Sequence, residues 1–227
     1  MTWYTPTGNR HGSQSSSGSQ NQIYETLRSR IVRCQMQPGE TVYEDRFAEE
    51  FGTSRTPVRE ALIKLRNDGL VSILPRKGTF VSHITVQDVY EIYQIRKLVE
   101  PGIGVTVKDE VDPVKLREFD DAFNRLTSDR ELLRDWFHLD RAFHTYLVEC
   151  ANNGMLLTMY ERIMNHQQRI SVLAAKQPKR LEETAKENGA IIEALLEKDD
   201  ERITEAITAH IMASWAASLR VQQLIRQ

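Results

Sequence analysis

The sequence predicts a mainly α-helical protein, in which a small domain of three helices and a hairpin precedes an all-α bundle of about six helices. Two observations predict this fold. Apolar residues recur at helical spacing along most of the 227 residues, and the strand-like runs are confined to residues 70–82. Hydrophobic residues make up 40% and charged residues 27%, the usual composition of a globular chain.

The N-terminal end predicts a tail followed by a first helix. Residues 1–20 are rich in Ser, Gly, Gln and Asn, which cannot bury a core, and we expect them to be disordered. A helical pattern begins at Asn21, and Pro38-Gly39 is expected to end that helix. Its apolar side chains recur every three or four residues: Ile23, Leu27, Ile31 and Cys34.

Two short helices and a hairpin complete an N-terminal domain that we expect to span residues 21–84. One helix is expected over 44–51, with Gly52 as its C-cap. The next begins at Thr53-Ser54 and is closed by Gly69. Two short strands should follow around a turn: 70–74, 79–82 and Pro75-Arg76-Lys77-Gly78.

Residues 85–227 predict helices alone, which should form a second domain beginning near residues 82–85. Six helices are expected near 87–109, 112–127, 131–151, 154–176, 179–198 and 200–226. No run of about 18 apolar residues occurs, so we expect no contact with a membrane. With no secretory signal and two distant cysteines, Cys34 and Cys150, a cytoplasmic location is expected.

The N-terminal domain carries the features of a winged helix-turn-helix that binds double-stranded DNA. Residues 1–84 hold 11 Lys and Arg against 8 Asp and Glu, whereas residues 85–227 hold 19 against 24. The third helix begins with Arg55, Thr56 and Arg59, at the end that such helices insert into the major groove. Arginine can bind guanine or phosphate with two hydrogen bonds. The alternative is that these arginines pair with three nearby carboxylates: Glu49, Glu50 and Glu60.

The second domain places polar residues on the inward, apolar faces of four helices. These residues are Arg96, Asp140, His144, Asn188 and His210. Burial of polar groups is costly unless they are paired, so convergence on one polar pocket is the economical explanation. Asp and His are ligands suited to Zn²⁺ or a similar ion. The alternatives are a hydrogen-bonded core histidine, a plain Asp140–His144 pair within one helix, and a bridge from Arg96 to Glu100.

Residues 47–71, FAEEFGTSRTPVREALIKLRNDGLV, resemble the winged-helix signature of the GntR family of bacterial regulators, and the SRTPVREAL run is very specific. The hairpin SILPRKGTFV resembles the wing of that family. The resemblance implies that Arg55 and Arg59 are the principal DNA contacts. It implies further contacts from Thr56, Arg66, Lys77 and Gly78, and from Arg46, near the start of the second helix, where family members often have an arginine.

The second domain resembles the FCD ligand-binding domain of the FadR branch of that family, in its smaller, VanR-like form. The resemblance rests on EIYQIRKLVE, Asp140-x-x-Phe143-His144, ANNGMLL, KENGAIIEALLEKDD and AITAHI. Metal-binding members hold a divalent ion with one Asp and three His. Asp140, His144 and His210 match three of these ligands, and Asn188 stands at the fourth position, as a weak ligand or a holder of water. Arg96, Asn153 and Asn188 are expected to bind the effector.

These patterns predict a regulator, most simply a repressor, rather than an enzyme. One recognition helix reads only a few base pairs, so we expect a homodimer on a palindromic operator. The pocket is expected to hold a divalent metal, Zn²⁺ above others, and to sense a small anionic, carboxylate-like metabolite. Three alternatives stay open: a metal-free anion pocket, a metal-dependent enzyme with a DNA-binding module, and an architectural protein whose bundle only dimerises. Metal content and thermal shifts with small molecules separate them.

Overall fold

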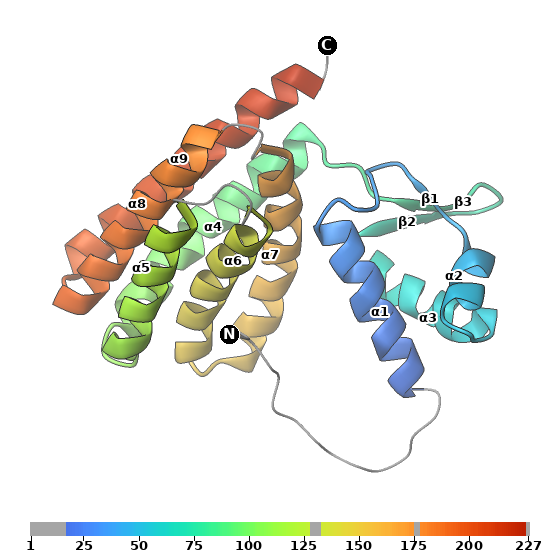
Figure 1. Ribbon diagram of the computed structural model, residues 1–227, viewed down its shortest axis with the longest axis horizontal. Coiled ribbons are helices and arrows are strands. Elements are labelled where there is room, and N and C mark those ends of the chain that lie inside the picture. The colour runs from blue at the N-terminus through green and yellow to red at the C-terminus, as the bar shows by residue number, and fades with distance from the viewer. Residues whose placement is uncertain (1–16, 128–132, 175–177, 226–227) are drawn as a thin grey trace. The chain divides into compact units, whose positions relative to one another are not determined.

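The computed structural model describes residues 17–127, 133–174 and 178–225 and divides the chain into two compact units. The N-terminal unit holds the residues up to Ile31 and Met36–Ser82, and the C-terminal unit holds Val32–Gln35 and His83–Gln227. The N-terminal unit consists of α1 (Ser17–Val32), β1 (Thr41–Val42), α2 (Glu44–Glu50), α3 (Arg55–Asn67), β2 (Val71–Leu74) and β3 (Gly78–Val81) (Figure 1).

The first helix differs from the sequence prediction at both ends. It begins at Ser17, within the stretch 1–20 that was expected to be a disordered tail, and residues 1–16 lie outside the described part of the chain. It ends at Val32 instead of near Pro38. The cause is local: Cys34 takes a left-handed conformation, with φ of 51°, and the Met36 N–H donates to the Arg30 carbonyl at 3.2 Å.

A three-stranded antiparallel sheet, in the order β1-β3-β2, includes a strand that the sequence did not predict. The predicted hairpin is present, with Ile73 opposite Thr79. The additional strand, β1, pairs with β3 through only two residues. Two residues are too few to show the alternation by which strands are recognised, so β1 was not predictable from its pattern.

The connection between α2 and α3 follows from Gly52. This residue has φ of +58°, in the left-handed region where glycine ends a helix without steric cost. Ser54 then precedes the first turn of α3 in an extended conformation. The inward face of α3 is buried as its spacing predicts, through Val58, Ala61, Leu62 and Leu65. This helix-turn-helix with its β2–β3 wing confirms the predicted fold of the N-terminal unit.

The C-terminal unit is all α-helical in its described residues and contains six helices, α4 to α9 (Figure 1). Their ends agree with the sequence prediction to within two residues. The helices are α4 (Val86–Val107), α5 (Pro113–Thr127), α6 (Leu133–Cys150), α7 (Gly154–Ala174), α8 (Pro178–Glu197) and α9 (Asp200–Ile225). None of the described helices is both long and apolar enough to cross a membrane.

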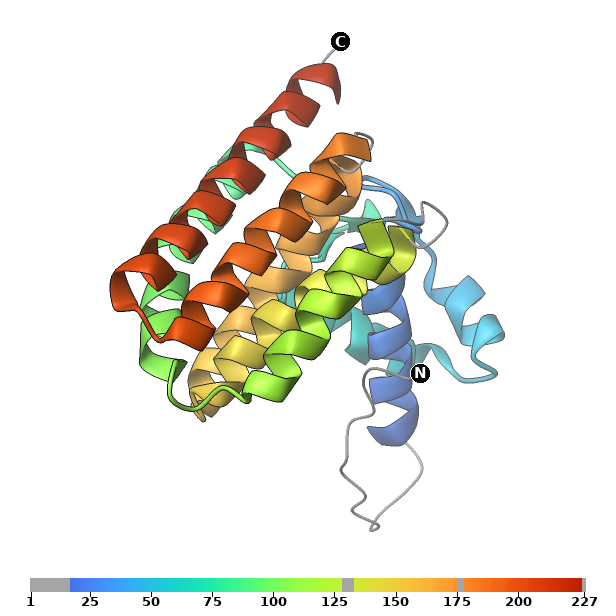
Figure 2. The same cartoon turned by 60° about the vertical axis from the view of Figure 1, so that its left-hand side comes forward.

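The six helices pack around one apolar core. The long helix α9 lies along α4 and α8, α5 packs against α8 and α6, and α7 contacts α6, α9 and α4 (Figure 2). The close approach of α4 and α9 depends on Gly104, since a Cβ atom there would lie 2.5 Å from Ile207 Cδ1 and 2.8 Å from Ile203 Cγ2. This packing brings the polar residues of α4, α6, α8 and α9 toward the same interior.

Candidate functional site

The N-terminal half of α3 exposes the residues predicted to contact DNA. Arg55, Thr56 and Arg59 are all solvent-exposed. Arg55 forms an ion pair with Asp45, and Arg59 Nη2 lies 3.0 Å from Glu44 Oε2. These partners lie at the start of α2, whereas the sequence pointed to other carboxylates. Exposed ion pairs contribute little to stability, so a phosphate or a base edge can replace the carboxylates on both arginines.

The remaining residues predicted to bind DNA are also exposed. Arg46 lies on α2, and Arg66, near the end of α3, donates to Asn67 Oδ1 at 3.3 Å. Lys77 and Gly78 form the turn of the wing, where Gly78 has φ of +112°. A long cationic side chain beside such a turn is free to follow a DNA backbone.

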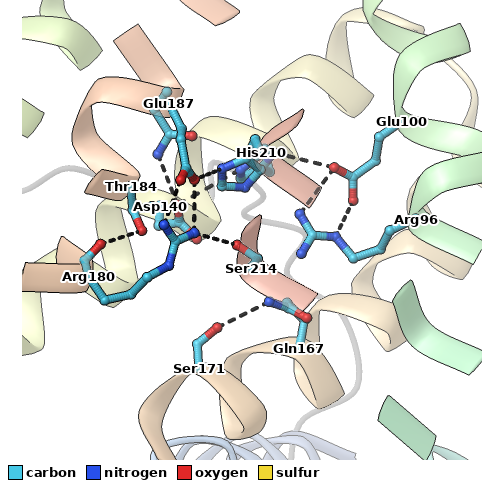
Figure 3. A network of polar contacts seen from close by, with 12 residues as sticks. Arg96, Glu100, Asp140, Gln167, Ser171, Arg180, Thr184, Glu187, His210 and Ser214 are labelled. Carbon is cyan, nitrogen blue, oxygen red and sulfur yellow. Dashed lines mark hydrogen bonds and ion pairs between the residues drawn. The ribbon is translucent and has the colours of Figure 1, made fainter. Parts of the chain in front are cut away.

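In the C-terminal unit, the inward polar residues of three helices come together. Asp140 and His144 lie on α6, Asn188 on α8 and His210 on α9. The ligand atoms that Asp140, His144 and His210 offer lie within 4.8 Å of one another. The two imidazole rings are stacked with centroids 5.0 Å apart, and Asn188 Nδ2 donates to Asp140 Oδ1 at 3.0 Å. Figure 3 shows Asp140 and His210 within this network.

Each histidine of this cluster has a carboxylate beside its Nδ1 atom. His210 Nδ1 lies 3.0 Å from Glu187 Oε2, and His144 Nδ1 lies 3.7 Å from Glu100 Oε2. A carboxylate at one ring nitrogen orients the other nitrogen as a ligand in many metal sites. Burial lowers the pKa of His144 to about 4, so this imidazole is neutral at physiological pH, as a metal ligand must be.

Two buried atoms of the cluster have no hydrogen-bond partner among the described residues. They are His144 Nε2 and Asn188 Oδ1. Unsatisfied buried polar atoms are rare because they cost free energy. A nitrogen and an oxygen acceptor beside Asp140 and His210 form a donor set that one divalent cation would satisfy together. The residues present therefore fit a metal ion, with Asn188 offering a neutral oxygen.

Arg96 lies deeper, in a closed ion pair. Its Nε and Nη2 atoms donate to the two carboxylate oxygens of Glu100 at 2.6 and 3.2 Å, and Tyr160 Oη donates to Glu100 Oε1 at 3.0 Å. Only 2% of Arg96 and 5% of Glu100 is exposed. Burial alone would raise the pKa of Glu100, but Arg96, with smaller contributions from His144 and His210, outweighs this effect and lowers that pKa. Of the interpretations offered for Arg96, the bridge to Glu100 is the one that the structure contains.

Asn153 differs from its expected place in the effector pocket. It is exposed, and its Oδ1 atom accepts hydrogen bonds from the backbone N–H groups of Met155 and Leu156, both at 3.1 Å. Asn153 therefore caps the N-terminus of α7, a common role for a short amide side chain. Its contact with the effector stays a prediction, because the match of a motif does not by itself distinguish a cap from a pocket residue.

Sequence reasoning missed two charged residues of α8 that complete the network. Arg180 donates to both carboxylate oxygens of Glu187, at 2.5 and 2.8 Å, and to Ser214 Oγ at 3.0 Å (Figure 3). A cavity of about 40 Å³ lies beside them, and its lining includes Arg180, Asp140, His210 and Gln167. A spacing of seven residues puts Arg180 and Glu187 on one face of a helix, which is the signal that could have found them.

Two protein-family models match the chain. Residues 19–81 match the model described as "Bacterial regulatory proteins, gntR family", and residues 91–213 match the FCD domain. Among curated proteins, "Uncharacterized HTH-type transcriptional regulator YdhC" of Bacillus subtilis is 31% identical over 83% of this chain and 86% of its own length. "HTH-type transcriptional repressor RspR" of Escherichia coli is 28% identical over 84% of each chain.

Among solved structures, E. coli McbR/YncC has the same fold, with a TM-score of 0.78, 22% identity and coverage of 89% of this chain and 97% of that one. A winged helix-turn-helix joined to this helical bundle defines the class of DNA-binding transcriptional regulators. The chain belongs to the GntR family and carries an FCD domain. The family and these relatives are regulators, which confirms the expectation that the chain is not an enzyme.

Proposed function

We propose that this regulator acts as a repressor and that a small anionic metabolite, bound at a divalent cation in the FCD domain, controls its affinity for DNA. The observation that carries the proposal is a pair of buried acceptors, His144 Nε2 and Asn188 Oδ1, which lie beside Asp140 and His210 and have no hydrogen-bond partner among the described residues. The similarity to RspR, which is named as a repressor, supports the direction of regulation. A metal-free anion pocket is the alternative.

Asp140, His144 and His210 would hold the cation, Zn²⁺ above others, with Asn188 as a weak fourth ligand or as a holder of water. The bound ion would supply a fixed positive charge for an anionic ligand. A hydrogen bond to Glu187 orients the His210 imidazole from its Nδ1 side, and the Glu100 carboxylate lies beside Nδ1 of His144. Because the ligands come from α6, α8 and α9, a ligand that prefers one arrangement of these helices can shift the conformation of the domain.

We further propose that the chain acts as a homodimer on a palindromic operator. A single recognition helix such as α3 reads too few base pairs to specify one site in a genome, and two copies related by a two-fold axis double the sequence that is read. Light scattering of the full chain at micromolar concentration without DNA should give the mass of two chains. The mass of one chain would contradict this part of the proposal.

Metal analysis of the full chain, purified without chelator and then supplied with Zn²⁺, tests the site. We expect about one ion per chain and a rise in the unfolding temperature on zinc addition. His144→Ala should lose the bound ion and the rise in unfolding temperature, whereas His138→Ala, on the exposed face of the same helix, should keep the ion and the rise. Far-UV circular dichroism verifies that both variants fold. No zinc and no thermal shift in the wild type would leave the metal-free alternative.

A further inference from the structure

Two arginines lie near the proposed metal site, and they differ in whether a ligand can reach them. Arg96 does not line the cavity, is 2% exposed, and already binds both carboxylate oxygens of Glu100, which also accepts from Tyr160. Arg180 lines the cavity together with Asp140 and His210. Its side chain is 12% exposed, and both of its terminal nitrogens face polar groups there (Figure 3).

We propose that Arg180, and not Arg96, recognises the anionic end of the effector, and that the effector is a small carboxylate which takes the place of Glu187 on the guanidinium of Arg180. The proposal rests on the proposed function as a ligand-sensing regulator. Glu187 already meets Arg180 through two parallel hydrogen bonds, at 2.5 and 2.8 Å. Any carboxylate can adopt this forked geometry. Glu187 therefore occupies the position on Arg180 that the carboxylate of the ligand would take.

The exchange leaves Glu187 with a partner. Its Oε2 atom lies 3.0 Å from His210 Nδ1 as well as 2.8 Å from Arg180 Nη2. When a ligand takes over the guanidinium, the Glu187 carboxylate keeps its hydrogen bond to the imidazole. The cost of an unpaired buried charge, which would oppose the displacement of Glu100 from Arg96, is therefore avoided at Arg180.

The charges around the cavity favour an anion only when the cation is present. Among the buried and half-buried side chains, Arg180 contributes one positive charge, and Glu187 and Asp140 contribute two negative charges. Glu183 also lies 3.8 Å from Arg180 Nη1, but it is 49% exposed, so water screens its charge. Arg180, Glu187 and Asp140 alone leave one negative charge in excess, whereas a divalent cation would turn the balance to one positive charge. A monocarboxylate then neutralises the site, so cation and carboxylate should each strengthen the binding of the other.

The rest of the cavity indicates the other end of the ligand. Gln167 lines it, is 4% exposed, and has a buried Oε1 atom with no hydrogen-bond partner in the described part of the chain. The same residue donates through Nε2 to Tyr93 Oη and to Ser171 Oγ, both at 3.1 Å. An unpartnered acceptor selects a ligand that carries a hydroxyl or N–H group. The volume of about 40 Å³, enough for a few water molecules, limits the size of that ligand.

Acetate and its neutral analogue acetamide are suitable probes. Each is titrated into the zinc-supplied full chain while tryptophan fluorescence is recorded, because one of the three tryptophans, Trp136, lines the cavity. We expect the wild type to bind acetate at millimolar concentration and to show no fluorescence change with acetamide. Arg180→Gln should weaken acetate binding about tenfold or more. Arg202→Gln, which removes an exposed arginine paired with Glu197, should leave it unchanged.

Glu187→Gln gives the decisive measurement, because it removes the competing charge but keeps an acceptor for His210. We expect it to bind acetate several-fold more tightly than the wild type, a gain that misfolding cannot produce. Acetate binding that survives Arg180→Gln, or that is absent from both the wild type and Glu187→Gln, overturns the proposal.

Zinc content, measured on the same samples, separates this inference from the proposed function. If the chain binds zinc but its fluorescence does not respond to acetate, the role proposed for Arg180 is wrong and the proposed metal site is retained. An acetate response that needs Arg180 but no zinc supports Arg180 and removes the metal from the proposed function.

Discussion

The arginines at the start of α3 and Arg96 inside the helical bundle are held in opposite ways. In the N-terminal unit, called the winged unit below, Arg55 and Arg59 are 68% and 65% exposed and pair with carboxylates at the surface. In the FCD unit, Arg96 and its partner Glu100 are almost completely buried. Water or phosphate can replace one partner of an exposed ion pair at little cost in free energy. Breaking a buried pair leaves a charge without a partner in the interior, which costs much more. The first arrangement suits contact with DNA, and the second fixes the interior of the helical bundle.

Glu100→Gln should show the largest effect of this difference, because it leaves Arg96 buried without a counter-charge. We expect a loss of about 3–5 kcal/mol in the free energy of unfolding. Its control, Glu50→Gln, removes the partner of Arg30 at the surface of the winged unit and should cost less than about 1 kcal/mol. Chemical denaturation followed by far-UV circular dichroism measures both, and tryptophan fluorescence follows Trp136 and Trp215 in the FCD unit. Equal small losses would show that burial does not distinguish the two pairs.

The same contrast explains what the sequence could predict. The principal residues predicted to contact DNA, Arg55, Thr56 and Arg59, lie together at the start of α3, so local helix geometry was enough to predict that they are exposed. The buried cluster was predictable in part, since Asp140, His144, Asn188 and His210 each interrupt an apolar stripe. Such interruptions show that a side chain points inward, but they do not show which partner it meets.

The residues that were missed or misplaced depend on partner choice and on short local geometry. The contact of Arg180 with Ser214 is decided by how α8 and α9 pack, which no periodicity specifies. The role of Asn153 as a cap depends on where α7 begins, to within one residue. The early end of α1 depends on the left-handed conformation of a single residue, Cys34.

Gly104→Ala tests the packing that brings the polar helices together. The added methyl group would lie 2.5 Å from Ile207 Cδ1, so we expect a destabilisation of about 1–3 kcal/mol from overpacking between α4 and α9. Gly102→Ala is the matched control on the same helix, because nothing lies within 4 Å of its Cβ position. That change should be neutral or stabilise the helix by about 0.5–1 kcal/mol. A loss of similar size for both variants would rule out the close contact.

Arg55→Ala and Arg59→Ala should act on DNA binding without unfolding the winged unit. A DNA fragment that the wild type selects from a random-sequence pool supplies the target, and unrelated DNA supplies the reference. At fixed salt, each change should weaken binding to the selected fragment by about 5- to 150-fold. Affinity for unrelated DNA should fall far less, because base contacts carry the sequence preference. If both variants retain the affinity of the wild type for the selected fragment, α3 is not the recognition helix.

Lys77→Ala should have the smallest effect, and a different kind of effect. Lys77 is an exposed point charge in the turn of the wing, and such a side chain neutralises phosphate without reading bases. Its removal should weaken binding to the selected fragment and to unrelated DNA by the same few-fold factor. It should also reduce the slope of log affinity against log salt by about one, since about one counterion fewer is released. A loss confined to the selected fragment, with the slope unchanged, would assign Lys77 to a base and make the wing a second reader of sequence.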